Sequence, residues 1–253
     1  MILILGGTTE GRELAALIRQ QGYQCALSVA SSLGRNFAND CQELICGELD
    51  YGQLKELIDD GGFRIILDAT HPYAEQIKLT AQRVAKEQGV IYLRYQRPAT
   101  ELPEVPNLIR VVDYRSGLKV LEQSTGGVFL TVGVRQLHLF QPLWTEQGRQ
   151  VWVKVLPALE SLERCSQLGL RPEQIFAFHG SGSKELVVAI LRQTGAEWLV
   201  TKESGAAGGT AQKVAAALES GKKVLVIDRP TVEAELLFDN YQAILEWLVK
   251  YKN

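Results

Sequence analysis

The sequence predicts an α/β fold in which parallel sheets are covered by helices on both faces, with the chain divided into two similar units. Short apolar runs alternate with amphipathic helical segments from one end of the chain to the other. The runs are continuously apolar, which is typical of strands buried on both faces of a parallel sheet. A six-residue motif occurs twice, and this repeat indicates the two units.

The expected strands follow the apolar runs. In order along the chain they are residues 2–5, 25–30, 44–46, 65–67, 91–93, 109–112, 128–132, 152–155, 175–178, 198–200 and 224–227. Between them lie helical patterns such as Gly11–Gln21, in which Leu14, Leu17 and Ile18 share one face. The C-terminal segment Asn240–Lys252 is also amphipathic, and we expect it to form a helix that packs on its own domain.

The repeated motif reads TAQRVA at residues 80–85 and TAQKVA at residues 210–215. Each copy is followed by a glycine, an apolar run and an Arg-Pro pair, which is Arg97-Pro98 first and Arg229-Pro230 later. This shared order favours two equivalent units, although two helices of one common type would produce the same match. The proline-rich stretch 97–107 marks the boundary. We therefore expect one domain at residues 1–100 and a second at residues 101–253.

Composition excludes several classes of function. The 253 residues include 27 Lys and Arg against 29 Asp and Glu, and this balance favours neither a nucleic-acid nor a membrane partner. The N-terminal MILILGGTTEG lacks the long apolar core of a signal peptide, so we expect a cytoplasmic protein. The four cysteines form no C-x-x-C pair, and the three histidines lie far apart in sequence. We therefore expect free buried thiols and no metal site.

A glycine-rich loop, GGTTEGREL at residues 6–14, follows the first expected strand and opens the first expected helix. A helix N-terminus attracts phosphate groups, and glycines let the backbone approach them closely. The G-x-G-x-x-G dinucleotide motif is only partly matched, because Thr8 stands at its middle glycine. A tight turn without a ligand is the alternative. The residues expected to bind a cofactor here are Gly6, Gly7, Thr8, Thr9, Glu10 and Gly11.

The end of the second expected strand indicates which dinucleotide binds. An NAD site usually has an acidic residue there for the ribose hydroxyls. This chain has instead Ser31, Ser32 and Arg35, which suit the additional phosphate of NADP. We therefore expect NADPH to be preferred over NADH. The missing acid also argues against S-adenosylmethionine.

The stretch DATHPYAEQ, residues 68–76, follows a third strand of the same sheet. Because ligands bind beyond the carboxyl ends of parallel strands, Asp68, Ala69 and Thr70 are expected to face the cofactor with the glycine loop. Pro72 fits the first turn of a following helix, capped by Asp68 or Thr70. His71 and Tyr73 can both donate a proton, so they are the candidate catalytic residues, and water is the third possible donor. A purely structural histidine is equally compatible with the sequence.

At this point the chain resembles a known family. The motifs GGTTEGREL, DATHPYAEQ, FLTVGVRQLHLF (129–140), KVLP (154–157) and TKESGAAGG (201–209) are similar to those of the precorrin-6A reductases, including the cobalt-precorrin-6A reductases. The resemblance covers nearly the whole chain. It implies two Rossmann-like units with a ligand cleft between them, and an NADPH-dependent reductase of cobalamin biosynthesis. Residues 179–184 depart from the family pattern, so no role is transferred to that loop.

The implied substrate is a contracted tetrapyrrole with many carboxylate arms, and the implied reaction is hydride transfer to one of its ring double bonds. Such a polyanion needs cations. Arg135, Lys154, Lys184 and Lys202 follow or end strands of the second half, and Ser204 and Gly205 open a second glycine-rich turn. These residues are expected to bind substrate carboxylates. The turn at Ser204 and Gly205 could equally bind a cofactor phosphate, or only join a strand to a helix. Each lysine or arginine has an alternative role as a solvated surface charge.

Two other classes of function remain open from the sequence. A nucleotide-sensing regulator would explain the first glycine loop but not DATHPYA. A transferase with a nucleotide donor would explain two units but would not oxidise NADPH. The sequence does not distinguish a cobalt-containing ring from a metal-free one. Handover of the product to other cobalamin-pathway enzymes is a further expectation of the resemblance.

Overall fold

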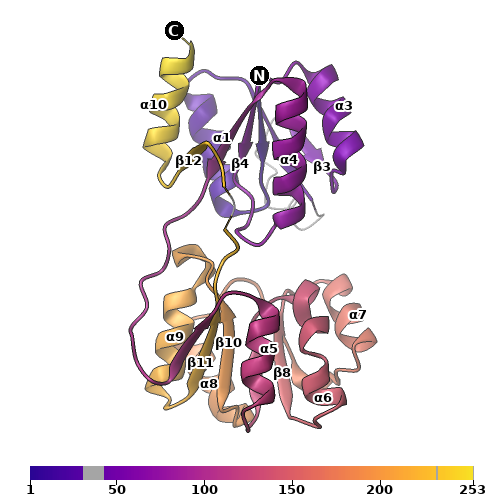
Figure 1. The fold of residues 1–253 in the computed structure, drawn as a ribbon, viewed down its shortest axis with the longest axis vertical. Coiled ribbons are helices and arrows are strands. Elements are labelled where there is room, and N and C mark those ends of the chain that lie inside the picture. The colour runs from indigo at the N-terminus through magenta and orange to yellow at the C-terminus, as the bar shows by residue number, and fades with distance from the viewer. Residues whose placement is uncertain (31–42, 232, 253) are drawn as a thin grey trace. The chain divides into compact units, whose positions relative to one another are not determined.

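The computed structural model describes residues 1–30, 43–231 and 233–252, and the chain forms two compact units (Figure 1). Unit 1 comprises Met1–Arg97 together with Thr231–Asn253, and unit 2 comprises Pro98–Pro230. The chain therefore crosses from unit 1 to unit 2 near Pro98 and returns near Pro230. Each unit contains one six-stranded sheet in which every pair of neighbouring strands is parallel.

The sheet of unit 1 has the strand order β12-β5-β4-β1-β2-β3. Its strands are β1 (Ile2–Leu5), β2 (Cys25–Val29), β3 (Leu44–Cys46), β4 (Ile65–Asp68), β5 (Ile91–Tyr95) and β12 (Leu236–Phe238). The order of the first five is that of a Rossmann fold, in which the direction of winding reverses between β1 and β4. That reversal opens a crevice at the carboxyl ends of these two strands.

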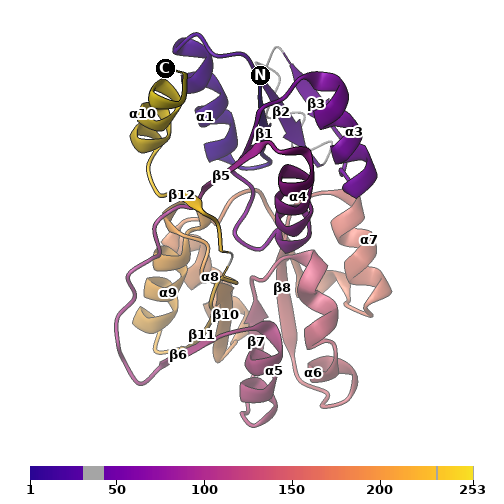
Figure 2. The ribbon, with the colours of Figure 1, turned by 45° about the horizontal axis from the view of Figure 1, so that its top comes forward.

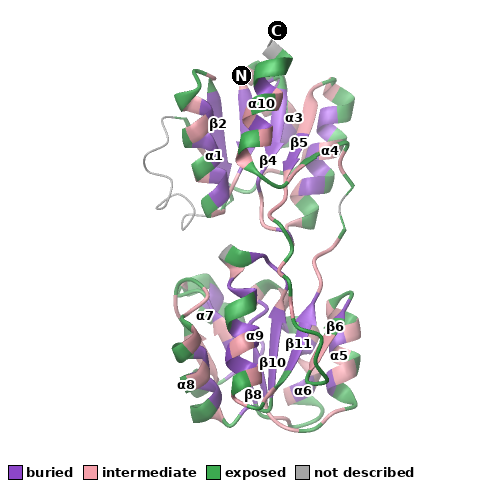
Figure 3. Cartoon of the chain, turned by 90° about the vertical axis from the view of Figure 1, so that its left-hand side faces the viewer, coloured by how far each residue is buried: buried purple, intermediate pink, exposed green. Residues whose placement is uncertain are grey.

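Helices cover both faces of this sheet (Figures 1 and 2). Apolar side chains of α1 (Thr9–Gln20) and α10 (Tyr241–Lys252) join one core, which includes Leu14 and Ile244. Those of α3 (Tyr51–Gly61) and α4 (Glu75–Gln88) join the core on the other face. Burial of the strands on both sides explains their continuously apolar sequence. Figure 3 shows the buried strands between half-exposed helices.

The sheet of unit 2 has the order β6-β11-β10-β7-β8-β9. Its strands are β6 (Leu108–Val111), β7 (Val128–Leu130), β8 (Val151–Val155), β9 (Ile175–Ala177), β10 (Trp198–Lys202) and β11 (Lys223–Ile227). Its helical segments are α5 (Tyr114–Glu122), η1 (Val134–Phe140), α6 (Pro142–Thr145), α7 (Leu159–Gln167), η2 (Pro172–Gln174), α8 (Lys184–Thr194), η3 (Ala206–Gly208) and α9 (Thr210–Glu219). Helices α8 and α9 share one core against the sheet. The predicted fold class is thus confirmed.

The repeated motif occupies equivalent places in the two units. TAQRVA lies in α4, between β4 and β5, and TAQKVA lies in α9, between β10 and β11. The glycine after each copy has a positive φ, 65° at Gly89 and 67° at Gly221. Both glycines end the helix by turning the chain toward the next strand. The repeat therefore reflects two equivalent α/β units and not merely two similar helices.

The expected second domain at 101–253 is wrong at its C-terminal end. One outer strand of each sheet does not pair with the strand that is its neighbour along the chain. Strand β6 follows β5 in sequence but pairs with β11 of unit 2, while β12 follows β11 but pairs with β5 of unit 1. Strand β12 was not among the expected strands, because its three apolar residues lie between polar segments and form too short a run to be recognised. Helix α10 follows β12 and also belongs to unit 1, because its Ile244 and Leu248 are buried in the core of that unit.

Candidate functional site

The first glycine loop is tightly folded at the carboxyl end of β1. Thr8 caps α1, since its Oγ1 accepts a hydrogen bond from Gly11 N–H at 3.2 Å. The same hydroxyl donates to the carbonyl of Ala69, which follows β4, at 3.0 Å. Gly7 has a φ of 98°, and a Cβ atom on Gly11 would lie 2.9 Å from Gly6 Cα. A side chain at Gly7 would have open space but a strained backbone, and one at Gly11 would crowd Gly6, so both positions favour glycine.

The β4 carboxyl end is organised around a buried carboxylate. Asp68 is 0% exposed and accepts hydrogen bonds from Thr70 N–H at 2.9 Å and Thr70 Oγ1 at 2.6 Å. Its other oxygen accepts from Tyr92 Oη and from Arg94 Nη1, each at 2.6 Å. Burial and then the charge of Asp68 raise the pKa of Tyr92, so the phenol stays protonated and donates. Asp68 thus holds both the backbone and the side chain of Thr70 in place.

His71 and Tyr73 lie together in a turn that precedes α4. The N–H of Tyr73 donates to His71 Nδ1 at 3.3 Å, and the two ring centroids are 5.7 Å apart. Nδ1 is then the acceptor nitrogen, which leaves the proton of a neutral imidazole on Nε2. Helix α4 begins only at Glu75 and has no side-chain cap. The expected cap by Asp68 or Thr70 is wrong, because the N-cap residue is Ala74 and the Asp68 carboxylate binds Thr70, Tyr92 and Arg94 instead.

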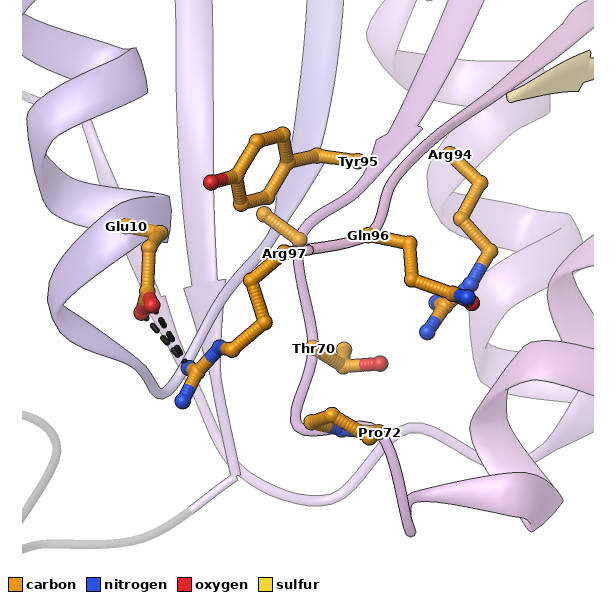
Figure 4. Close-up of a pocket in the computed structure, with 8 residues that line it drawn as sticks. Glu10, Thr70, Pro72, Arg94, Tyr95, Gln96 and Arg97 are labelled. Atoms are coloured by element: carbon orange, nitrogen blue, oxygen red, sulfur yellow. Dashed lines mark hydrogen bonds and ion pairs between the residues drawn. The ribbon is translucent and has the colours of Figure 1, made fainter. Parts of the chain in front are cut away.

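A small pocket opens between these loops and the end of β5 (Figure 4). Its lining residues are Glu10, Ala69, Thr70, Pro72, Arg94, Tyr95, Gln96 and Arg97. Glu10 and Arg97 form a largely buried ion pair across it, with Oε1 2.7 Å from Nη2. The structure therefore brings together the glycine loop, the Asp68–Thr70 segment and the His71–Tyr73 turn, all within unit 1.

Two of the expected substrate lysines converge in unit 2. Lys154 lies on β8 and Lys202 ends β10, and the short strand β7 separates these strands. Gly133, after β7, has a φ of 82°, and a Cβ atom there would be 3.8 Å from Lys202 Nζ. Burial, and then the charge of Lys154, lowers the pKa of Lys202 to about 8. Burial also lowers the pKa of Lys154, whose ammonium lies 5.0 Å from the centre of the Phe178 ring.

A third lysine that the sequence analysis did not select completes this cluster. Lys213, on α9, is 7% exposed. Burial, followed by the charges of Lys202 and Lys154, lowers its pKa to about 7. We call Lys154, Lys202 and Lys213 the lysine cluster. Lys213 belongs to the repeated TAQKVA motif, so its position was visible in the sequence, but nothing there showed that it is buried.

The remaining expected substrate residues have other surroundings. Arg135 is exposed on η1, and Lys184 pairs with Glu219 at 2.6 Å on the surface. The N–H of Ser204 donates to Thr210 Oγ1 at 3.1 Å, and that of Gly205 donates to Glu203 Oε1 at 3.0 Å. These two N–H groups therefore have internal acceptors and shape the second glycine loop.

Other predictions concern residues or sites of a different kind. Ser31, Ser32 and Arg35 lie outside the described residues. Cys25 and Cys165 are buried free thiols, whereas Cys46 is exposed, contrary to the expectation for it. Within the described ranges no three His, Cys, Asp or Glu side chains gather as metal ligands would. In the same part of the chain, no helix has the length and apolar character needed to cross a membrane.

The fold and the crevice at β1 and β4 place this chain in the class of two-unit Rossmann-type α/β proteins. Comparison with known proteins narrows the class. The family described as precorrin-6x reductase CbiJ/CobK matches residues 1–249, and the chain belongs to this family.

Individual relatives agree with this assignment. The chain is 32% identical to the cobalt-precorrin-6A reductase of Priestia megaterium, over 98% of both proteins. It is 33% identical to the cobalt-precorrin-6A reductase of Methanothermobacter thermautotrophicus, over 98% of this chain and 83% of that protein. A solved structure of CobK precorrin-6A reductase superimposes with a TM-score of 0.81 at 24% identity, covering 99% of this chain and 96% of that one. This last likeness supports the two-sheet fold.

Proposed function

We propose that the protein reduces a ring double bond of a contracted tetrapyrrole, precorrin-6A or cobalt-precorrin-6A, with NADPH as the hydride donor. Membership of the family is the observation that supports this reaction. The two relatives above, both cobalt-precorrin-6A reductases, favour the cobalt form of the ring. The geometry that supports a dinucleotide is the hydrogen bond between Thr8 and Ala69, which joins the glycine loop to the β4 loop at the Rossmann crevice.

The residues of unit 1 fit a dinucleotide. Gly6 and Gly11 let the backbone pack closely at the N-terminus of α1, where a pyrophosphate is favoured, and the space beside Gly7 is open. When bound, NADPH supplies the hydride. Thr9 and the buried Glu10 lie in the first turn of α1, and Ala69 and Thr70 line the adjoining pocket. We retain Ser31, Ser32 and Arg35 as the proposed partners of the 2′-phosphate.

Asp68 receives a different role in this proposal. Its carboxylate already accepts four hydrogen bonds and is fully buried, so we propose that it positions Thr70 and the following turn and does not contact the cofactor. His71 follows directly, with Nδ1 as an acceptor and Nε2 as the proton-bearing nitrogen. We propose His71 as the donor of the proton that the ring takes up, with Tyr73 as the alternative donor.

The lysine cluster of unit 2 is proposed to bind carboxylate arms of the substrate. Among the residues that the structure describes, no carboxylate forms an ion pair with Lys154 or Lys213, and burial of these two ammonium groups is unfavourable without an anion. A bound carboxylate would offset that unfavourable burial. Exposed Arg135 is proposed as an additional contact, whereas Ser204 and Gly205 shape the loop beside Lys202.

An anaerobic assay tests this function. Purified protein is mixed with NADPH and cobalt-precorrin-6A, and in parallel with metal-free precorrin-6A, while absorbance at the nicotinamide band is followed. We expect NADPH oxidation that depends on the tetrapyrrole, with NADH at least tenfold less efficient. A nucleotide-sensing regulator or a nucleotide-donor transferase would leave the nicotinamide absorbance unchanged with both rings. A cytoplasmic location and handover of the product to other cobalamin-pathway enzymes stay predictions.

A further inference from the structure

A single carboxylate in unit 2 connects three separate parts of the chain. Glu203 Oε1 accepts hydrogen bonds from Gly205 N–H and from Thr100 N–H, each at 3.0 Å. Its Oε2 pairs with the guanidinium of Arg229. Glu203 is 1% exposed. The second glycine loop is therefore tied both to the segment that enters unit 2 and to the segment that leaves it.

The two crossing segments are also bonded to each other. Arg229 Nη2 donates to the carbonyl of Pro98 at 3.2 Å. Pro98 is the first residue of unit 2, and Pro230 is its last. The repeated Arg-Pro pairs, which the proposed reaction does not explain, thus have a structural role. Arg97 binds Glu10 beside the first glycine loop, and Arg229 binds Glu203 beside the second.

The Glu203 carboxylate is ionised in this environment. Burial by itself would raise its pKa, but hydrogen bonds from Arg229, Thr100 N–H and Gly205 N–H outweigh burial and lower it. Charge-assisted hydrogen bonds of this kind are shorter and stronger than neutral ones. At neutral pH the ionised Glu203 therefore binds Arg229, Thr100 N–H and Gly205 N–H strongly.

Glu203 also fixes the backbone next to Lys202 of the lysine cluster. It directly follows Lys202 in the chain, and its side chain holds Gly205, whose φ is 73°. On the other side of the loop, Thr210 Oγ1 donates to the carbonyl of Lys202 at 3.0 Å. The backbone that carries Lys202 is therefore fixed by the Glu203 carboxylate at one point and by the Thr210 hydroxyl at another.

We propose that Glu203 is a positioning residue: it holds Lys202 and the second glycine loop in the anion-binding arrangement by tying them to both crossing segments. This inference rests on the proposed function, in which Lys202 binds a substrate carboxylate. Binding of the tetrapyrrole then orders the crossing segments, and by linkage their ordering strengthens binding of the tetrapyrrole.

Steady-state kinetics of two variants and one control test the proposal. Glu203→Gln removes the charge that faces Arg229, and Arg229→Lys keeps a charge but loses the paired guanidinium contact. We expect each to raise KM for the tetrapyrrole roughly tenfold, with kcat and the KM for NADPH changed less than about twofold. Asp228→Asn is the control, because Asp228 adjoins Arg229 but pairs with exposed Arg110 on the surface. The control should match the wild type.

Hydrogen exchange supplies a readout that needs no turnover. In the wild type, amides of Thr100 and Gly205 should exchange slowly, and cobalt-precorrin-6A should slow exchange across residues 96–102 and 228–231. In Glu203→Gln both amides should exchange faster and the effect of the tetrapyrrole should disappear. If Glu203→Gln does not fold, as judged by near-ultraviolet circular dichroism, the decision passes to Arg229→Lys.

Two results would overturn the proposal. One is wild-type KM values and wild-type exchange in a folded Glu203 or Arg229 variant. The other is an equal loss of affinity for NADPH and for the tetrapyrrole, which indicates general destabilisation. A wild-type protein that never oxidises NADPH rejects the proposed function instead, and the exchange comparison still decides whether Glu203 fixes the loop and the crossing segments.

Discussion

Asp68 and Arg94 form an ion pair inside unit 1, with Oδ2 2.6 Å from Nη1 and neither side chain more than 1% exposed. Replacing one partner of a buried pair leaves the other charge uncompensated, which typically costs about 3–5 kcal/mol. We expect Asp68→Asn to lower the free energy of unfolding by about 3 kcal/mol in urea denaturation. Arg83→Gln, which breaks an exposed pair with Glu87, is the matched control and should change little. Equal stability of the two variants would contradict this assignment.

The first glycine loop gives a prediction for the cofactor alone. Gly11→Ala would place a Cβ atom 2.9 Å from Gly6 Cα, so the loop must shift. We expect the KM for NADPH to rise at least tenfold, while affinity for the tetrapyrrole is unchanged. Gly52→Ala is the control, because Gly52 also lies in the first turn of a helix but its nearest atom is 3.5 Å away. Fluorescence titration with NADPH would measure the dissociation constants of both variants. Equal values for Gly11→Ala and Gly52→Ala would reject the loop as the phosphate site.

The lysine cluster predicts a pH dependence of anion binding. Because the pKa of Lys213 is about 7 and that of Lys202 about 8, both lysines lose charge as the pH rises through this range. Affinity for the tetrapyrrole should therefore be highest below pH 7 and fall as the pH rises from 7 to 9. Lys213→Met should weaken binding roughly ten- to a hundredfold at pH 7 and reduce the pH dependence. Calorimetric titrations across this range measure both effects.

The same lysine affects stability with a definite sign. Lys213 is protonated up to about pH 10.5 when unfolded but only to about pH 7 when folded, so the unfolded state binds more protons between these values. The free energy of unfolding should increase with pH there, and Lys213→Met should remove part of that increase. Lys223→Gln serves as the control for Lys213→Met in the binding and the stability experiments, because Lys223 is exposed at the amino end of β11. A control that behaves like Lys213→Met would show a general charge effect.

The turn before α4 allows the proton donor to be identified. We expect His71→Ala to lower kcat at saturating substrate by about 100-fold, which is typical of losing a general acid, and to change the pH profile of kcat. Tyr73→Phe keeps the backbone N–H that orients His71 and should retain most of the turnover. The reverse pattern would transfer the role to Tyr73. Near-wild-type turnover in both variants would exclude both as the acid.

Much of the site was predictable because loops at the carboxyl ends of parallel strands must meet at one edge. From this rule alone the sequence indicated that Gly6–Gly11 and Asp68–Tyr73 lie together, and Thr8 and Ala69 are indeed hydrogen-bonded. The roles within the site were less accessible. For Asp68 the sequence predicted a cofactor contact, and nothing in the sequence shows that Tyr92 and Arg94 of β5 donate hydrogen bonds to its carboxylate.

Membership of the outer strands was not predictable for a related reason. Apolar runs and helical periodicity are local properties, so they located nearly every strand and the final helix within a few residues. Which sheet an outer strand joins depends on pairing between distant segments. The pairing of β12 with β5, and of β6 with β11, therefore could not be inferred from either segment by itself.

The sequence by itself determined the α/β class, the two equivalent units and the positions of the loops proposed to carry the chemistry, because these follow from local patterning and from a repeated motif. Only the tertiary structure decided that the C-terminal segment returns to unit 1, that Lys213 joins Lys154 and Lys202, and that Glu203 connects both crossing segments. Each of these depends on which distant side chains become buried against one another. Burial changes the energy of a charge, and the order of residues along the chain does not record it.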